Sequence, residues 1–94
     1  MDIHYVQMDD IDEQFESAAK SVFNLKNRPS DYQMLQLYGL YKQSLFGNNK
    51  TPKPGVFDFK GKEKWNAWKN VSGKGKTKAK QEYINLVEQL KMLE

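Results

Sequence analysis

The segment 30–47 constrains the fold most, because it carries the signals of one complete helix. Ser30 and Gln33 form a capping box, in which a serine and a glutamine three residues later satisfy free N–H groups at a helix start. The apolar and aromatic residues that follow at helical spacing are Met34, Tyr38, Tyr41 and Leu45. Gly47 predicts an end in a left-handed turn. One long helix is therefore predicted here.

The stripe of this helix is unusual for a core face, since it carries two phenols and has Lys42 on its flank. A buried tyrosine needs a partner for its hydroxyl, and lysine is rarely buried without a counter-charge. Two interpretations stay open on this segment alone. It is either a core helix with its hydroxyls at the surface, or a face that holds a flat, anionic and partly apolar ligand.

A helix is also predicted before this segment. Asp10 and Glu13 supply the acidic start that the helix dipole favours. The apolar residues that recur at helical spacing after it are Ile11, Phe15, Ala18, Ala19 and Val22. Pro29 should end it near Asn27, because the residue before a proline is disfavoured in a helix. Residues 1–10 show no sustained period and are predicted to form an N-terminal arm.

After the long helix, Lys50–Gly55 contains two prolines and a glycine, which predict a loop. Val56–Phe59 alternates in hydropathy, and we expect an ordered loop that buries its aromatic side chains. A short helix is predicted over Glu63–Val71, with Trp65 and Trp68 on one face and mainly in the core.

A last helix is predicted up to the C-terminus from a stripe of five residues. They are Ala79, Tyr83, Leu86, Val87 and Leu90. Lysines crowd its start at 74, 76, 78 and 80, where the helix dipole favours acids. Either the helix begins late, with Thr77 as its cap, or the lysines meet an anion. The predicted fold is an all-α bundle of four helices over residues 11–94, with a long loop between the second and third helices.

Composition narrows the class of protein. Ninety-four residues suffice for one domain, and a mean hydropathy of −0.86 without a long apolar run argues against a membrane span. Cysteine is absent and no leader pattern opens the chain, so we expect a cytoplasmic protein. The net charge of +3 is uneven, with lysines concentrated over 60–80. Such a field attracts an anion, whether nucleic acid, an acidic membrane surface or a phosphorylated small molecule.

Catalysis is not expected. Without cysteine, and with its single histidine (His4) in the arm, the chain offers no activated nucleophile and no plausible metal triad. The glycine- and lysine-rich run after Ser72 lacks the spacing and preceding strand of a phosphate-binding loop. We therefore predict a non-enzymatic protein with no metal and no cofactor.

Three sequence blocks together resemble the acyl-CoA-binding protein family. The first is Lys26–Asp31 followed by Met34, Leu35, Tyr38, Tyr41, Lys42 and Gln43. The second is Pro54–Gly55 followed by Asp58–Lys62, Lys64, Trp65, Ala67 and Trp68. The third is Tyr83, Ile84, Val87, Glu88 and Leu90. The three blocks occur in the order and at the spacing of the family, from about Phe15 to the C-terminus. Together they are a far more specific signal than any one block.

The resemblance implies an antiparallel four-helix fold of the acyl-CoA-binding protein type. It also implies a surface cleft that binds long-chain acyl-CoA esters reversibly, with the acyl chain inside and the nucleotide at the rim. The nucleotide and phosphate residues it implies are Arg28, Tyr38, Tyr41, Lys42, Lys64 and Tyr83. The acyl and pantetheine residues it implies are Phe15, Ala19, Val22, Met34 and Leu35. It further implies transport or buffering by a monomer, with acyl-CoA-using enzymes and anionic membrane surfaces as further partners.

The chain departs from the family pattern at a few positions. Phe23 stands where many relatives have a basic residue, so one phosphate contact is replaced by an apolar side chain. Arg28 stands where relatives usually have lysine, which keeps the charge but changes its geometry. The turn Gly73–Lys78 lacks the serine and acids that open the last helix in relatives, and the arm is longer than in compact members.

Two other classes of function stay open. The lysine-rich segment 60–80 and the pI of about 9.1 are typical of a small nucleic-acid-binding module. Against it, Arg28 is the only arginine, and arginine dominates specific contacts with bases. The second alternative is an interaction module whose cleft holds a partner helix. We expect no nucleic-acid partner.

Overall fold

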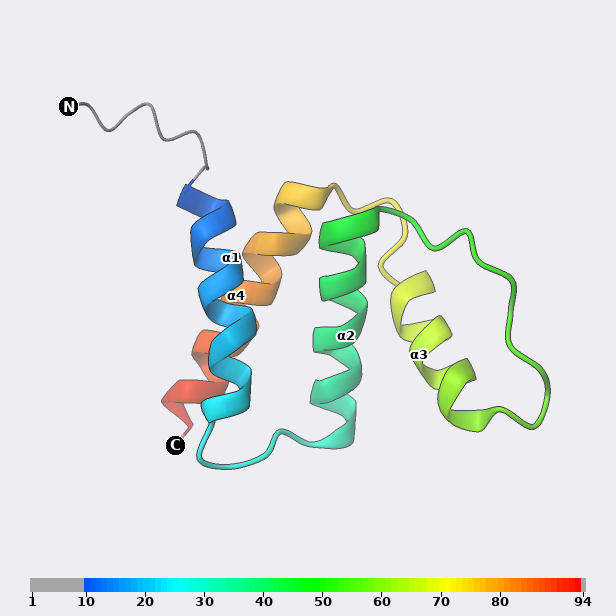
Figure 1. Ribbon diagram of the computed structural model, residues 1–94, viewed down its shortest axis with the longest axis horizontal. Coiled ribbons are helices and arrows are strands. Elements are labelled where there is room, and N and C mark those ends of the chain that lie inside the picture. Colours follow the sequence, from blue (N-terminus) through cyan, green and yellow to red (C-terminus); the bar gives the residue numbers. More distant parts are fainter. Residues whose placement is uncertain (1–9, 94) are drawn as a thin grey trace.

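The structure is a computed structural model that describes residues 10–93. It contains α1 (Asp10–Ser21), the short 3₁₀ helix η2 (Val22–Asn24), α2 (Asp31–Phe46), α3 (Phe59–Lys69) and α4 (Lys76–Met92) (Figure 1). Four α-helices and no strand within these residues confirm the predicted all-α class. Over the same range, none of the helices is long and apolar enough to cross a bilayer. His4 and nearly all of the predicted arm lie outside the described residues.

α4 is the helix on which α1 and α2 both pack, while α3 packs on α2. The loop after α2 returns the chain along the outer edge of the molecule, so α3 ascends beside α2 in the same general direction (Figure 1). This pair of neighbouring helices therefore departs from the antiparallel arrangement expected. The reason is the length of the loop, which lets the chain return to the far end before α3 begins.

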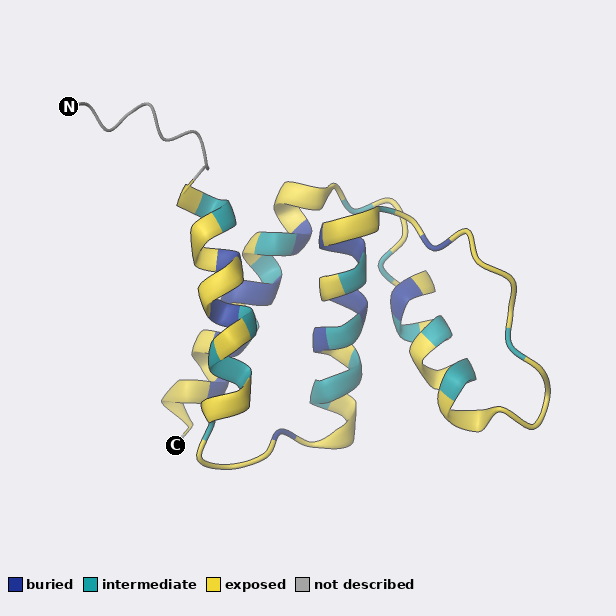
Figure 2. Cartoon of the chain, viewed as in Figure 1, coloured by how far each residue is buried: buried dark blue, intermediate teal, exposed yellow. Residues whose placement is uncertain are grey.

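The core lies where α1, α2 and α4 meet (Figure 2). Its buried residues are Phe15, Ala18, Leu37, Leu40, Ala79, Tyr83, Ile84, Val87 and Leu90. Four of the five residues predicted for the last helix are in this set, and Leu86 packs against it from a partly buried position. The periodicity of α4 therefore identified its buried face correctly.

α2 begins as predicted. The Gln33 backbone N–H donates to Ser30 Oγ over 3.1 Å, and the Ser30 N–H donates to Gln33 Oε1 over 2.9 Å, which completes the capping box. Gly47 ends the helix at φ +77° and ψ −151°. This backbone conformation favours glycine, but it lies outside the left-handed helical turn that was expected.

α3 and the long loop are joined by the two tryptophans. Trp68 is buried, and its Nε1–H donates to the Gly47 carbonyl over 2.8 Å. Trp65 is partly buried, and its Nε1–H donates to the Thr51 carbonyl over 2.9 Å. The Nδ2 of the buried Asn49 donates to the Trp65 carbonyl over 3.1 Å. The tryptophans thus anchor the loop on α3, a role that was not predicted. The prediction of core packing is confirmed for Trp68, which is buried, although neither tryptophan belongs to the cluster between α1, α2 and α4.

Two predicted helix boundaries were wrong. The first helix ends at Ser21 and continues only as η2. α3 begins at Phe59 rather than Glu63, because Asp58 caps it by accepting the Gly61 N–H over 2.9 Å. The prediction that Val56–Phe59 buries its aromatics was also wrong, since Phe57 and Phe59 are exposed.

α4 begins at Lys76 with Gly75 at its N-cap, so the lysines do occupy its first turn and Thr77 is not the cap. Part of their charge is balanced by acids of the protein itself. Lys74 Nζ lies 3.0 Å from a carboxylate oxygen of Glu82. Lys80 Nζ lies 2.6 Å from Asp12 Oδ1 on α1. The second of these ion pairs links the start of α4 to the start of α1.

Candidate ligand-binding site

Three aromatic rings from three helices meet between α1 and α2. The Phe15 ring stacks on Tyr41, with centroids 5.6 Å apart and an interplanar angle of 23°. Tyr83 contacts Phe15 edge-on at 5.1 Å and Tyr41 at 5.9 Å. Phe15 and Tyr83 are buried, whereas Tyr41 is 37% exposed. Tyr41 therefore offers solvent an aromatic surface that is held in place from behind.

A groove of about 350 Å³ lies in front of these rings. It is lined by Ala19, Val22 and Phe23 on one side, by Met34, Leu37, Tyr38 and Tyr41 on the other, and by Tyr83 at its floor. The groove lies between α1 and α2, each of which packs on α4, and Ala19 contributes only a methyl group to the wall formed by α1 and η2. Its surface is mostly hydrocarbon and aromatic, with phenol hydroxyls as the polar groups.

A second hollow of about 500 Å³ continues along α1 toward the start of α4. It shares Ala19, Phe23 and Tyr41 with the groove and is bordered by Lys20 and Lys80. Lys80 is paired with Asp12, so its charge is already balanced. The two hollows form one elongated depression, with Phe23 and Tyr41 facing it at its middle.

The cationic rim of the groove comes from two different helices. Lys42 Nζ on α2 lies 5.9 Å from the Tyr38 ring centroid, and Lys64 Nζ on α3 lies 5.6 Å from the same centroid. Lys42 Nζ is also 4.7 Å from the ring of Phe46 and 5.0 Å from that of Trp68. Neither lysine has a carboxylate partner among residues 10–93. Two uncompensated charges thus converge on one tyrosine.

Tyr83 is held in its neutral form. Burial, and secondarily the neighbouring Tyr41, raise the pKa of the Tyr83 phenol from 10.0 to about 12. The charged phenolate is disfavoured because the low-dielectric surroundings cannot solvate it. At neutral pH the group is therefore a hydroxyl that can donate or accept a hydrogen bond.

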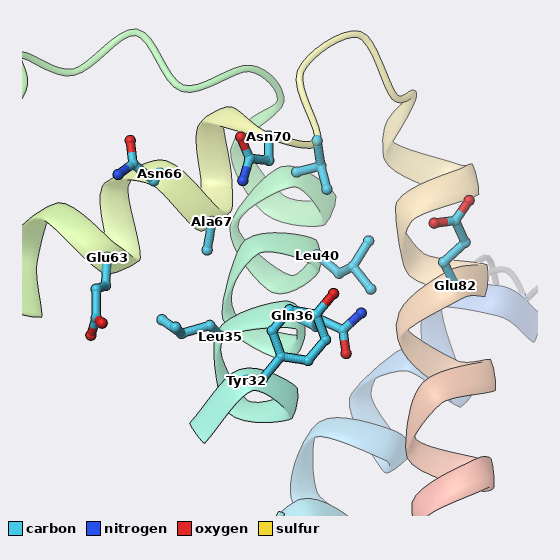
Figure 3. A pocket seen from close by; sticks show the side chains of 10 residues that line it. Tyr32, Leu35, Gln36, Leu40, Glu63, Asn66, Ala67, Asn70 and Glu82 are labelled. Carbon is cyan, nitrogen blue, oxygen red and sulfur yellow. The ribbon is translucent and has the colours of Figure 1, made fainter. Parts of the chain in front are cut away.

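Two of the site residues implied by the resemblance lie elsewhere. Arg28 is in the exposed link before α2, where its Nη1 lies 3.4 Å from Asp31 Oδ1. Leu35 lines a separate hollow of about 460 Å³ between α2, α3 and α4 (Figure 3). In that hollow Leu35 points toward α3 and Leu40 toward α4, with the acids Glu63 and Glu82 at its edges. The structure brings the other nine implied residues to the groove, its rim or the rings behind it.

Sequence reasoning gave no site role to several residues of the depression. Leu37 belongs to the groove wall although it is largely buried, and Leu45 and Lys20 border the second hollow. Leu45 was assigned to the stripe of α2 without a role in a site. The available signal was the continuation of the Tyr38–Tyr41 stripe by one more turn, which places Leu45 beside the same depression.

The arrangement suits one kind of ligand. An apolar trough can hold a hydrocarbon chain, an open tyrosine ring can stack on a flat base, and two adjacent ammonium groups can bind phosphate. No set of three His, Asp or Glu side chains positioned to hold a metal ion occurs in the described part of the chain. The geometry thus provides binding groups along a groove.

Known proteins of one family match this chain over most of its length. The family described as "Acyl CoA binding protein" matches residues 12–87. An acyl-CoA-binding protein homolog from Drosophila melanogaster is 52% identical over 80 residues, which cover 85% of this chain and 93% of the relative. An acyl-CoA-binding protein from Saccharomyces cerevisiae is 49% identical over 76 residues, covering 81% and 87% respectively.

The fold agrees with a solved structure as well. The crystal structure of Oryza sativa acyl-CoA-binding protein 2 superposes with a TM-score of 0.82 at 44% identity, covering 85% of this chain and 89% of the rice protein. Matches of this extent define the class of protein. The chain belongs to the acyl-CoA-binding protein family.

Proposed function

We propose that this protein binds long-chain acyl-CoA esters reversibly in the groove between α1 and α2, and that it thereby transports or buffers them without catalysis. The observation that carries the proposal is the convergence of two unpaired lysines, Lys42 and Lys64, at the rim of an apolar groove. The names of the relatives agree with this ligand.

Each part of the ligand has a counterpart in the groove. The acyl chain would lie along Ala19, Val22 and Met34, with each fully buried methylene contributing about 0.8 kcal/mol. The adenine would stack on a tyrosine ring, a contact of roughly 1–3 kcal/mol per base. Tyr41 is the more suitable ring, because Phe15 and Tyr83 hold it in place from behind.

The phosphates would be bound by Lys42 and Lys64 through charge-assisted hydrogen bonds. Because these lysines belong to α2 and α3, the affinity for the phosphates depends on how closely the two helices pack. Arg28 would first have to break its ion pair with Asp31 before it could bind a phosphate. Leu35 would contact the ligand only if the acyl chain reached the other side of α2. We therefore assign neither of them to the principal contacts.

The setting of this activity is part of the proposal. We propose that the protein acts as a cytoplasmic monomer and exchanges its ligand with acyl-CoA-using enzymes and with anionic membrane surfaces. Absence of catalysis is supported by the character of the groove, where the polar side chains are phenols and ammonium groups that bind without a nucleophile or a paired acid and base.

Nucleic acid suits the structure less well. The lysines that suggested it are partly neutralised, because Lys74 pairs with Glu82 and Lys80 pairs with Asp12. A partner helix would need a groove with a continuous apolar rim, whereas here the rim holds free ammonium groups.

The experiment is a calorimetric titration with a long-chain acyl-CoA, with free CoA and with duplex DNA at physiological salt. We expect saturable one-to-one binding of acyl-CoA, much weaker binding of free CoA and no saturable binding of DNA. Free CoA separates the contribution of the acyl chain from that of the phosphates. Saturable binding of DNA without binding of acyl-CoA would refute the proposed function.

A further inference from the structure

The end of the long loop exposes apolar side chains that the groove does not use. Val56 is 69% exposed, Phe57 is 86% exposed and Phe59 is 68% exposed. Leaving a valine and two phenylalanines in water at consecutive or alternate positions is unfavourable for the isolated protein. Together with the lysines around them, described below, we call this surface the Phe57 edge.

The local backbone holds these side chains outward. The Asp58 N–H donates to the Gly55 carbonyl over 3.1 Å, which closes a turn with Val56 and Phe57 at its two central positions. The Asp58 carboxylate accepts the Gly61 N–H and so fixes the start of α3. The exposure of the Phe57 edge therefore results from an ordered turn with hydrogen bonds on both sides.

The other end of the loop is fixed as well. Asn49 Oδ1 accepts from both the backbone N–H and the hydroxyl of Thr51, over 2.9 and 2.6 Å. The Thr51 carbonyl in turn accepts the indole N–H of Trp65 on α3. A turn anchored on both sides cannot readily fold its aromatic side chains back onto the protein, so the apolar surface is available to a partner.

Lysines flank these apolar residues in the sequence. The lysines in the same stretch of chain are Lys50, Lys53, Lys60 and Lys62. None of them forms an ion pair with another residue that the structure describes. Of the two acids in this stretch, Asp58 is engaged at the start of α3, which leaves Glu63 as the only other opposing charge. By contrast, Lys74 and Lys80 have carboxylate partners.

We propose that the Phe57 edge docks the protein on an anionic membrane surface. Phenylalanine side chains at a projecting turn can enter the boundary between headgroups and acyl chains, while flanking lysines bind anionic headgroups. The surface projects from the protein, which fits a bilayer better than it fits a protein groove that would need a deep complementary cavity. Charge complementarity with anionic lipid selects this occupant.

The position of the edge agrees with this role. It lies on the outer loop and at the start of α3, on the side of the molecule opposite α1 (Figure 1). The acids in the first turn of α1, Asp10, Asp12 and Glu13, are therefore remote from the proposed membrane side. The inference rests on the membrane contact included in the proposed function and names the surface that makes it. It does not depend on acyl-CoA binding, since the groove residues take no part.

The test is co-sedimentation of the ligand-free protein with phosphatidylcholine vesicles, with or without phosphatidylserine. We expect binding that requires phosphatidylserine and weakens as salt is raised. Phe57→Ser should lower the apparent affinity on the order of tenfold, because one aromatic side chain no longer enters the interface. Met92→Ser removes an 83% exposed side chain at the end of α4 and should leave the affinity unchanged.

A second variant and its matched control test the contribution of the lysine charges to membrane binding. Lys60→Gln should weaken binding to phosphatidylserine vesicles by a few-fold, on the order of one lost juxtamembrane charge, and Lys91→Gln on α4 should not. Absence of wild-type binding to these vesicles would overturn the proposal, even if a soluble protein were found to contact the edge. Equal loss of binding in Phe57→Ser and Met92→Ser would overturn it too.

Acyl-CoA titrations without vesicles distinguish this proposal from the proposed function. Phe57→Ser should bind acyl-CoA like the parent, so that vesicle binding alone is lost. A parent that bound vesicles through the Phe57 edge but did not bind acyl-CoA would refute the proposed function and leave the membrane surface supported.

Discussion

Replacing Gly39 by alanine should separate α2 from α3. A Cβ built on Gly39 would lie 2.8 Å from the carbonyl carbon of Ala67 and closer still to its oxygen. Both atoms belong to the backbone of α3, so no side chain can move aside. Reaching an ordinary contact of at least 3.4 Å requires a displacement of 0.6 Å from the carbonyl carbon and a larger one from the oxygen, so the helices must part by more than 0.6 Å.

The expected cost follows from this displacement. Overpacking a well-packed contact costs typically about 1–3 kcal/mol, whereas the better helix propensity of alanine returns up to about 1 kcal/mol. We therefore expect Gly39→Ala to lower the free energy of unfolding by roughly 1–2 kcal/mol. In a domain of this size, each 1 kcal/mol corresponds to a fall of about 4–8 °C in Tm.

Thermal and urea unfolding measure this effect, with Gly55→Ala as the matched control. The Cβ added at Gly55 meets nothing within 4 Å, so its effect should stay within about 0.5 kcal/mol. Because the two lysines proposed to bind the phosphates lie on α2 and α3, Gly39→Ala should also weaken acyl-CoA binding. A Gly39→Ala variant as stable as the Gly55→Ala variant would contradict the described packing of α3 on α2.

Three further predictions concern the groove and the helix start. Lys42→Ala and Lys64→Ala should each weaken acyl-CoA binding by about 1.5–3 kcal/mol, as expected for a lost hydrogen bond to a charged group. Lys91→Ala should leave the binding unchanged. If calorimetry gave the two variants the affinity of the parent, Lys42 and Lys64 would not belong to the site. Because the folded pKa of Tyr83 is raised, its neutral form stabilises the fold fully below pH 10, and that contribution is lost as pH rises toward 12. Urea titrations should therefore show the parent losing on the order of 2 kcal/mol relative to Tyr83→Phe over this range, and parallel pH profiles would argue against a buried phenol. Ser30→Ala should cost about 1 kcal/mol through loss of the cap, and an unchanged urea midpoint would contradict the capping box.

Local signals predicted much of the fold. The capping box of α2 and the buried stripe of α4 depend on residues a few positions apart, so the sequence contains the necessary information. The starts of α3 and α4 were harder to place. Asp58 caps α3 from within a segment that also resembles a short strand, and Gly75 precedes a run of lysines that disfavours a helix start.

Contacts between segments that are distant in the sequence could not be predicted from local sequence patterns. Gly39 was not recognised as the site where α2 approaches α3, because that role depends on the backbone at Ala67. The exposure of Phe57 was likewise missed, since hydropathy predicts burial and only the turn at Gly55 and Asp58 directs the side chain outward.

In the candidate site, too, local spacing predicts some features, whereas others depend on how the helices pack. Consecutive helical residues point about 100° apart, so Met34 faces the groove while Leu35 faces the hollow on the other side of α2. The resemblance placed both residues along one acyl path. The convergence of Lys42 and Lys64 on Tyr38 required the mutual placement of two helices, which motif spacing alone does not determine.

The central claim is that the ligand occupies the groove between α1 and α2. Backbone amide chemical shifts recorded by NMR during titration with a long-chain acyl-CoA test it most directly. The groove predicts the largest saturable changes at Ala19, Tyr38 and Tyr41, with small changes around Leu35 and Ala67. Changes centred on Leu35 and Ala67, with Ala19 and Tyr41 unaffected, would place the ligand in the hollow between α2 and α3 and contradict the claim.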